Sequence, residues 1–441
     1  MAEIRPLRAW RYAPNLTNEL SELVSPLFDV VSAKQRALLY GNSNNSIHIS
    51  VPQSVPNEAG NAVVSYENVG KTLENWKING IIKQDNLPAI YVYYQHFTLS
   101  GSHKEYIRKG FICHIRAYDF DENVILRHEN TIPHAVNDRT QILTATLMNA
   151  APTHGLYTDE THELEVFMDE AMKIPIYETE DYQGVRDVLA VIHDKNIIDK
   201  FINNISQKKI ILADGHHRYT SSLEYRKTQT ALNPNHTGKE LYNYHLMYLT
   251  NTESDDLRIL PTHRLILGLS DFDEKEFIQK LEQYFILKET EDAYEINHQI
   301  SGKKWTFGLV LKEKSFKIRL KPEVFDTISW NFPLIMKELD LTVLHYFVLE
   351  RCLGILGKDQ RASENISFSR SFSECMEKVH LGQAQMALIT QDVPMESIKK
   401  VCESGYTLPQ KSTYFYPKVI CGFLFGSIDD KEMTKLVDKL F

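Results

Sequence analysis

The clearest chemical pattern in the chain lies at positions 208–226, which read KKIILADGHHRYTSSLEYR. The apolar residues 210–213 predict a buried strand, and the pattern after position 215 predicts a helix. Backbone N–H groups at the start of a helix have no partner within the helix and carry partial positive charge. Groups able to hold anions or move protons therefore gather at one strand-to-helix turn, namely Asp214, Gly215, His216, His217 and Arg218.

A phosphate-bearing ligand fits this turn best. Gly215 lets the backbone bend tightly or approach a ligand, and the planar fork of Arg218 matches phosphate oxygens. Asp214 and His217 are candidate catalytic residues, and His216 is a candidate ligand contact. Two other interpretations stay open. The histidines could serve a metal site, although neighbours on a helix point in different directions, or Asp214 could simply cap a surface helix.

A second cluster, Arg127-His128-Glu129-Asn130-Thr131, precedes a predicted helix that contains Arg139. Here Glu129 could act as a general base or as a ligand of Mg²⁺, and Arg139 could hold an anion. The alternative is that the segment before the helix only caps it and forms a surface salt bridge. Nearer the N-terminus, Asp29 follows an apolar turn and is a further candidate base, although an ordinary turn acid would look the same.

The third cluster is the stretch QKSTYFYPK at 410–418. Lys411, Ser412 and Thr413 look like the end of a P-loop, but residues 403–409 contain one glycine, which argues against a Walker A motif. Lys411 or Lys418 could still reach a phosphate as a point charge. An aromatic strand with solvated lysines is the competing interpretation.

Composition limits the classes of partner. A formal net charge of −9 argues against non-specific nucleic-acid binding, which needs a basic face. No stretch approaches the length of an apolar membrane span, and the first residues lack the apolar core of a signal peptide. The five cysteines are scattered, which is typical of buried free thiols. We therefore expect a cytoplasmic protein with small-molecule partners, and a homodimer is possible.

Predicted strands and helices alternate, which favours an α/β or α+β core with mixed sheets and flanking helices. We expect strands at 89–94, 111–115, 163–168 and 209–213, and helices at 137–149 and 185–194. A length of 441 residues suggests two or three domains. We place three regions at 1–125, 126–255 and 256–441.

Taken together, these clusters resemble a family of proteins of unknown function, DUF1015. The matching motifs include the turn at 25–30, where Phe28 stands in place of the usual tyrosine while Asp29 is kept. The others lie at 44–45, 91–93, 108–111, 128–131 with Arg139, 213–219, 260–264 and 408–418. This resemblance covers nearly the whole chain. It implies no particular activity.

The turn alone is also similar to the nucleotide-binding box of the ParB and sulfiredoxin superfamily, which includes free serine kinases. That similarity implies that ATP or ADP binds with Mg²⁺. Gly215, His216, His217 and Arg218 would face the phosphates, and Asp214 would assist the metal or the acceptor hydroxyl. It also makes a ParB/sulfiredoxin-like core an expectation for the fold.

Three functions follow as hypotheses. The first is a phosphotransferase acting on a small hydroxyl metabolite, with free L-serine as the first guess, Asp29 or Glu129 as the base, and Arg139 and Lys411 assisting Arg218. The second is a nucleotide-binding regulatory protein without turnover. The third is a metal-dependent hydrolase with the ligands His128, Glu129, His216, His217 and His263.

Overall fold

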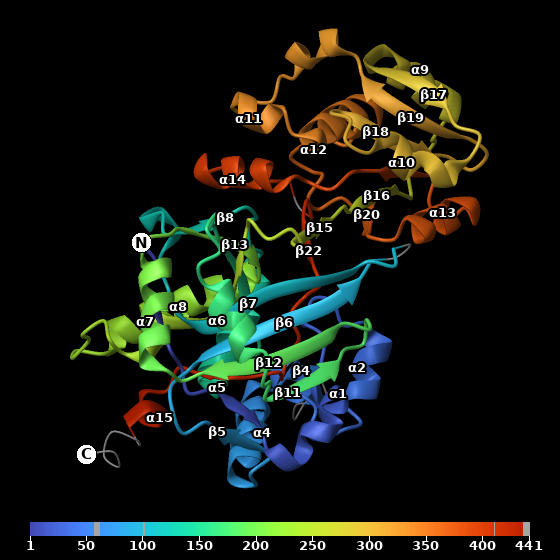
Figure 1. Cartoon of the computed structure of the whole chain (residues 1–441). Helices are drawn as coiled ribbons and strands as arrows, with labels where there is room; N and C mark the ends of the chain where they lie inside the picture. Colours follow the sequence, from blue (N-terminus) through green and yellow to red (C-terminus); the bar gives the residue numbers. More distant parts are fainter. Residues whose placement is uncertain (57–61, 100–101, 410, 435–441) are drawn as a thin grey trace. The chain divides into compact units, whose positions relative to one another are not determined.

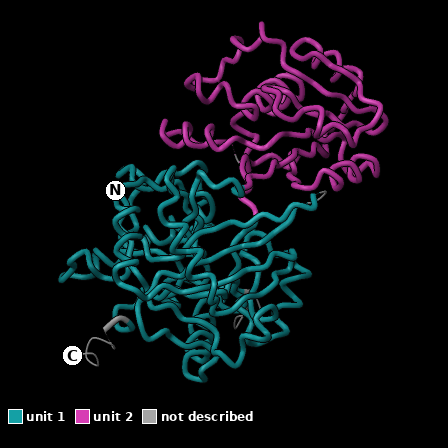
Figure 2. The backbone as a smooth tube through the Cα atoms, in the orientation of Figure 1, with its two compact units in different colours: residues 1–257, 417–441 teal, residues 258–416 magenta. Residues whose placement is uncertain are grey.

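The computed structural model describes residues 1–56, 62–99, 102–409 and 411–434, which form two compact units (Figure 2). Unit 1 comprises Met1–Leu257 and Pro417–Phe441, and unit 2 comprises Arg258–Tyr416. The chain thus leaves unit 1 and later returns to it. The expected boundary at 255 lies near the start of unit 2, and the one at 125 lies within unit 1. The division into three regions stays a prediction.

Unit 1 is built on a nine-stranded mixed sheet with the order β11-β12-β6-β7-β14-β10-β13-β8, in which β1 also pairs with β7 (Figure 1). The pairs β10–β14 and β13–β8 are parallel, and the other pairs are antiparallel. The strands are β1 (Ile4–Arg5), β6 (Ile90–Thr98), β7 (Glu105–Arg116), β8 (Ile125–Arg127), β10 (Thr153–Tyr157), β11 (Tyr177–Glu180), β12 (Arg186–Ile192), β13 (Ile210–Asp214) and β14 (Tyr244–Asn251).

The two faces of this sheet bury different cores because successive strand residues point to opposite sides. Tyr248 on β14 packs with Tyr93 and Phe423 in one core, whereas its neighbour Leu249 belongs to the other core, with Phe111 and Phe201. Aromatic rings meet on both faces: Tyr93–Tyr248 centroids lie 4.9 Å apart and Phe111–Phe201 centroids 4.8 Å apart. The returning C-terminal stretch therefore supplies part of the core of unit 1.

Helices and short strand pairs complete unit 1, and α5 packs against α8. The helices are α1 (Leu20–Leu23), α2 (Ala33–Leu39), α3 (Ile47–Ser50), α4 (Tyr66–Ile78), α5 (Pro133–Thr146), α6 (Glu165–Ala171), α7 (Lys195–Ser206), α8 (His216–Leu232) and α15 (Asp430–Thr434). The short pairs join β2 (Trp10–Tyr12) to β5 (Ile82–Gln84), β3 (Ser54–Pro56) to β4 (Ala62–Val64), and β9 (Met148–Asn149) to β23 (Gly426–Ser427).

Two expectations about secondary structure are wrong. The strand expected at 163–168 is helix α6, because Leu164 and Met168, four residues apart, are both buried on one side. The helix expected at 185–194 is strand β12, which lies between β11 and β6 in the sheet. Its run DVLAVI is buried on both faces, and such runs show no alternation to distinguish them from helices.

Unit 2 contains a six-stranded antiparallel sheet with the order β17-β19-β18-β21-β16-β20 and a separate ribbon, β15–β22. Its strands are β15 (Arg258–Leu260), β16 (His263–Ile266), β17 (Phe285–Glu289), β18 (Thr306–Val310), β19 (Ser315–Leu320), β20 (Ile366–Ser369), β21 (Met386–Ile389) and β22 (Tyr414–Tyr416). Its helices are α9 (Glu274–Tyr284), α10 (Ile296–Ile300), α11 (Leu334–Lys337), α12 (Asp340–Val343), a π-helix (Leu344–Cys352), α13 (Phe372–His380) and α14 (Met395–Glu403).

The fold class is confirmed: the protein is mixed α/β, with several sheets and flanking helices. Within the described part of the chain, none of the helices is both long and apolar enough to span a bilayer.

Candidate functional site

The predicted turn joins strand β13 to helix α8 in unit 1. The strand is buried up to Ala213, and Gly215 precedes the first helical residue with a φ of +89°. A Cβ atom at Gly215 would lie 2.6 Å from Thr153 Cγ2 and 2.9 Å from Arg218 Nη2. Both the backbone conformation and the space therefore require glycine here. No side chain caps α8, and the first N–H groups of a helix have no acceptor within the helix itself.

Asp214 is held between two cations. Arg218 donates from Nη2 to Oδ2 at 2.9 Å, and Lys418 donates from Nζ to Oδ1. Burial by itself raises the pKa of Asp214, but the charges of Lys418 and Arg218 outweigh it and hold the pKa well below its usual range. Asp214 is therefore an ionised anchor whose two oxygens are already engaged.

Three buried histidines surround this carboxylate. The rings of His128 and His216 meet edge to face, with centroids 4.8 Å apart, and His154 pairs with Asp214 across β10 and β13. Burial lowers the pKa of His128 to about 4 and lowers the pKa values of His154 and His216 well below the usual range. All three rings are therefore neutral at pH 7.

The turn histidines differ in their hydrogen bonding. His216 is 6% exposed, and its Nε2 atom is buried without a hydrogen-bond partner among the described residues. A buried polar atom of this kind is rare and calls for an acceptor or donor from outside the protein. His217 Nε2 instead accepts from the backbone N–H of Ile132 at 3.0 Å, which fixes the tautomer with its hydrogen on Nδ1.

Arg139 also lies near the turn. It is buried on α5, where Nε and Nη2 donate to Asp138 and Nη1 donates to the carbonyl oxygen of Ser50 at 2.6 Å. Arg139 and Arg218 line one cavity of unit 1, so the structure brings together two of the predicted anion-binding residues.

The two candidate bases lie in loops. Glu129 is half-buried between β8 and α5 and directly follows His128, whose ring contacts His216. Asp29 is exposed in the turn before α2, one residue after Phe28, which lines the cavity shared by the two arginines. Both residues are thus connected to the site through an immediate neighbour in the sequence.

The third cluster is divided between the units. Lys411, Ser412 and Thr413 belong to unit 2, where Ser412 is buried and donates to the carbonyl oxygen of Pro409. Their part in a shared site stays a prediction. Lys418, from the same motif, belongs to unit 1 and contacts Asp214. The sequence pattern had marked Lys418 only as a solvated lysine or a point charge for phosphate.

Two further residues of the site had weak signals in the sequence. His128 lies in the second cluster, where the sequence pattern indicates only a metal ligand. His154 had no distinguishing motif, because only the register of β10 against β13 places it opposite Asp214. Its Nε2 atom lies 2.7 Å from the Thr250 hydroxyl, which links it to β14.

A preformed metal site is not supported by the donor set. Among the residues described, no group of three or more His, Cys, Asp or Glu is arranged to hold a metal ion. Both oxygens of Asp214 are bound to cations, and His263 lies in unit 2, where its Nδ1 accepts from Thr390 N. The expected ligands Glu129 and Asp214 therefore do not form a ready site for Mg²⁺.

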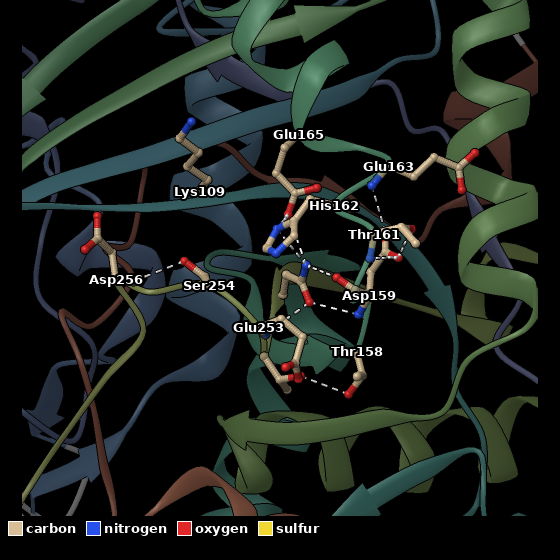
Figure 3. A network of polar contacts seen from close by, with 12 residues as sticks. Lys109, Thr158, Asp159, Thr161, His162, Glu163, Glu165, Glu253, Ser254 and Asp256 are labelled. Atoms are coloured by element: carbon tan, nitrogen blue, oxygen red, sulfur yellow. Dashed lines mark hydrogen bonds and ion pairs between the residues drawn. The ribbon is translucent and has the colours of Figure 1, made fainter.

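A second polar network lies where strands β10 and β14 end (Figure 3). Asn251 donates to the Asp159 carbonyl oxygen at 2.7 Å and to Glu165 at 3.1 Å, and it accepts from Asp159 N at 2.9 Å. Asp159 in turn accepts from Thr161 and from the backbone N–H of Glu163. These bonds are internal to the network, which fastens the ends of the two parallel strands.

Unit 2 has a larger cavity of about 380 Å³ between the loop before β18 and the start of α14. None of the predicted site residues lines it. Size alone therefore does not identify the site, and the chemistry of the turn in unit 1 is the better guide.

The fold and the turn define a mixed α/β protein with a buried, cation-rich strand-to-helix turn. The chain belongs to the family described as "Protein of unknown function (DUF1015)", whose model matches residues 4–342. This confirms the resemblance noted from the sequence motifs. No curated protein matches the chain.

Solved structures similar to this chain include a conserved hypothetical protein from Pyrococcus furiosus, with 12% identity, a TM-score of 0.34, and coverage of 70% of this chain and 93% of the other. Free serine kinase in complex with AMP has 14% identity, a TM-score of 0.33, and coverage of 71% and 90%. SbnI with a C-terminal truncation, from Staphylococcus aureus, has 14% identity, a TM-score of 0.35, and coverage of 75% and 97%.

Proposed function

We propose that this protein binds ATP or ADP through its phosphates at the turn between β13 and α8. It transfers a phosphoryl group to the hydroxyl group of a small metabolite, and free L-serine is the first acceptor to test. The observation that carries this proposal is the uncapped start of α8, where Arg218, Lys418 and the unpartnered Nε2 of His216 gather around an obligatory glycine.

Each group of the turn has a distinct task. The N–H groups at the start of α8 bind phosphate oxygens, and Gly215 allows the backbone to approach them closely. Arg218 and Lys418 neutralise phosphate charge, and Asp214 holds both cations in place. The neutral imidazole of His216 donates or accepts one further hydrogen bond.

The base has to come from outside the turn. Asp214 is a poor base because its pKa is held low and both oxygens are occupied. Glu129 is the better placed of the two remaining carboxylates, since it adjoins His128 beside His216, and Asp29 is the alternative. The base takes the acceptor's hydroxyl proton while the new O–P bond forms. The bond between the transferred phosphorus and the bridging oxygen of the nucleotide breaks.

Mg²⁺ would arrive bound to the nucleotide phosphates, where it would neutralise charge on the transferred group. Both carboxylate oxygens of Asp214 are already bound to cations, so we assign no step to a metal bound by the protein itself.

The acceptor can be found by incubating the protein with magnesium nucleotide and a panel of amino acids and polyols, with product detection by mass spectrometry. We expect one phosphorylated product. Glu129→Gln should lower kcat by about 100-fold or more without weakening nucleotide binding, because it removes proton transfer alone. Glu170→Gln, on an exposed residue, is the matched control and should keep full activity.

A nucleotide-binding regulatory protein is the second candidate. The observation in its favour is that the carboxylate of the turn, Asp214, is engaged by two cations that hold its pKa low, so it is a poor base. Nucleotide binding without transfer to any member of the panel would select this function. In that case wild type, Asp29→Asn and Glu129→Gln should all bind nucleotide without hydrolysis or transfer, whereas a phosphotransferase would lose measurable turnover in at least one variant.

A further inference from the structure

A small cavity lies behind Arg218 within unit 1, and its volume is about 50 Å³. One water needs about 10–15 Å³ of such space, whereas ligand pockets for drug-sized molecules measure about 300 Å³ or more. The cavity therefore fits a single compact group and excludes a nucleoside. Its polar lining comes from Ser50, Arg139, Asn149, Arg218 and Ser221.

The charged side chains that line this cavity are of one sign. Its lining contains two arginines and no carboxylate. The carboxylates that pair with these arginines, Asp138 and Asp214, are not among the lining residues. They orient the two guanidinium groups. The remaining wall is mostly apolar, which strengthens electrostatic attraction at short range.

Two buried donors on residues that line the cavity have no acceptor in the described part of the protein. Asn149 is 8% exposed, and its Nδ2 atom is buried without a hydrogen-bond partner, as is Nε of Arg218. Arg139 has five N–H hydrogens, and its bonds to Asp138 and Ser50 use three of them. Leaving buried donors unsatisfied costs free energy, because each has lost its hydrogen bonds to water without gaining another acceptor. An acceptor that enters the cavity would recover that energy.

The plane of Arg139 is also fixed in advance. Its guanidinium carbon lies 4.0 Å from the ring centroid of Phe28, which lines the same cavity. A stacked and salt-bridged guanidinium loses little entropy when it binds a planar or tetrahedral oxyanion.

We infer that this cavity binds one small oxyanion, either a phosphate or a carboxylate group, between Arg139, Arg218 and Asn149. The inference does not depend on phosphoryl transfer or on nucleotide binding. The oxyanion site and the turn share Arg218, so an oxyanion in the cavity and a nucleotide at the turn would each alter the affinity for the other.

The test is calorimetric titration of the full chain at low ionic strength, in separate experiments with inorganic phosphate and with acetate. We expect one equivalent of at least one probe to bind. Phosphate alone, acetate alone or both would identify the oxyanion. Asn149→Asp keeps the shape of the side chain but replaces the donor with an anion, so affinity should fall at least tenfold. Arg139→Gln should have a similar effect.

Arg186→Gln is the control, because Arg186 is an exposed arginine on β12 whose loss should leave oxyanion binding unchanged. Thermal melts establish that each variant is folded, and ADP titration reports on the turn separately. If the wild type binds neither probe, or if folded Asn149→Asp and Arg139→Gln both bind as tightly as the wild type, the inference is wrong. Loss of oxyanion binding with ADP binding retained in these variants would place the oxyanion in the cavity.

Discussion

At the scale of single residues, the contact between Asp214 and Lys418 is the most consequential. A buried carboxylate shared by two cations stays ionised, and removing one cation leaves charge without full compensation. The same contact holds Lys418 where a phosphate group would meet it. Its effects on stability and on ligand binding can be separated by substitution.

We predict that Lys418→Met destabilises the protein by about 2–4 kcal/mol, because the buried carboxylate of Asp214 would keep only one of its two cations. Asp214→Asn in the same chain should recover part of this loss, since the uncompensated charge is removed. Denaturant unfolding of the single and double variants measures both effects. Lys400→Met, on an exposed lysine, is the control. Equal stability of Lys418→Met and the wild type would contradict the view that Lys418 stabilises the buried charge of Asp214.

A second buried carboxylate, Asp187, adjoins this site through Gln95. Gln95 Nε2 donates to Asp187 Oδ1 at 2.8 Å and to the Lys418 carbonyl oxygen at 3.1 Å. Burial, assisted by Asp181, raises the pKa of Asp187 to about 8. Asp187 is therefore protonated at pH 7 in the folded protein and ionised in the unfolded chain.

A raised pKa makes the folded state bind the extra proton between about pH 4 and 8, so stability falls as pH rises through this window. The slope from one such group is at most about 1.4 kcal/mol per pH unit. Asp187→Asn mimics the protonated form and should flatten the profile. Urea unfolding across this pH window measures how the free energy of unfolding changes with pH. Asp199→Asn, at an exposed position, is the control. Identical profiles for Asp187→Asn and the wild type would refute this view.

At the scale of elements, the turn depends on Gly215 more than on any charged residue. Two penalties apply to a side chain there: the positive φ and the overlap with Thr153. Gly184, in the turn between β11 and β12, has a similar φ of +74° but open space around its Cβ position. Comparing alanine substitutions at the two glycines therefore separates the free-energy cost of the backbone conformation from the cost of atomic overlap.

We predict that Gly215→Ala costs about 1–3 kcal/mol more than Gly184→Ala, because only the former forces neighbouring atoms apart. Gly215→Ala should also weaken nucleotide binding, since the start of α8 has to shift. Thermal unfolding and ADP titration of both variants provide the comparison. If the two alanine variants were equally stable and bound ADP equally, the turn would not be the close-packed element described above.

Local patterns were sufficient for the elements that carry the turn. The apolar run before Asp214 and the glycine after it gave β13 and the start of α8. Two segments could not be assigned locally: residues 163–166 alternate like a strand although they lead into α6, and residues 188–192 of β12 are continuously apolar because the sheet buries both faces. The partners of Asp214 were also inaccessible to local patterns. His154 meets it through strand register and Lys418 through a contact between residues 204 positions apart.

At the scale of the whole molecule, unit 1 is completed by the stretch after unit 2. Phe423 and Phe425 lie in the core on one face of the large sheet, and Ser25 and Trp10 form bridges with Cys421 and Phe425. Lys418 comes from the same stretch. Part of the core of unit 1 and part of its site therefore come from residues beyond 416.

We predict that a chain ending at residue 416 loses the cooperative unfolding transition of unit 1 and all nucleotide binding. Phe425→Ala should destabilise the full chain by about 3–5 kcal/mol, the usual cost of deleting a buried phenylalanine. Leu232→Ala, at an exposed position on α8, should have little effect. Calorimetry records these transitions. A truncated chain that still unfolds cooperatively and binds ADP would show that the C-terminal stretch is dispensable.

The central claim is that nucleotide phosphates bind at the turn between β13 and α8, and titration of ADP into the wild type, Arg218→Gln and Arg186→Gln tests it most directly. Charged hydrogen bonds contribute about 1.5–3 kcal/mol each, so we predict that Arg218→Gln weakens ADP binding roughly 10- to 100-fold. Arg186→Gln should bind like the wild type. Absence of ADP and ATP binding to the wild type, or equal affinities for all three proteins, would contradict the claim.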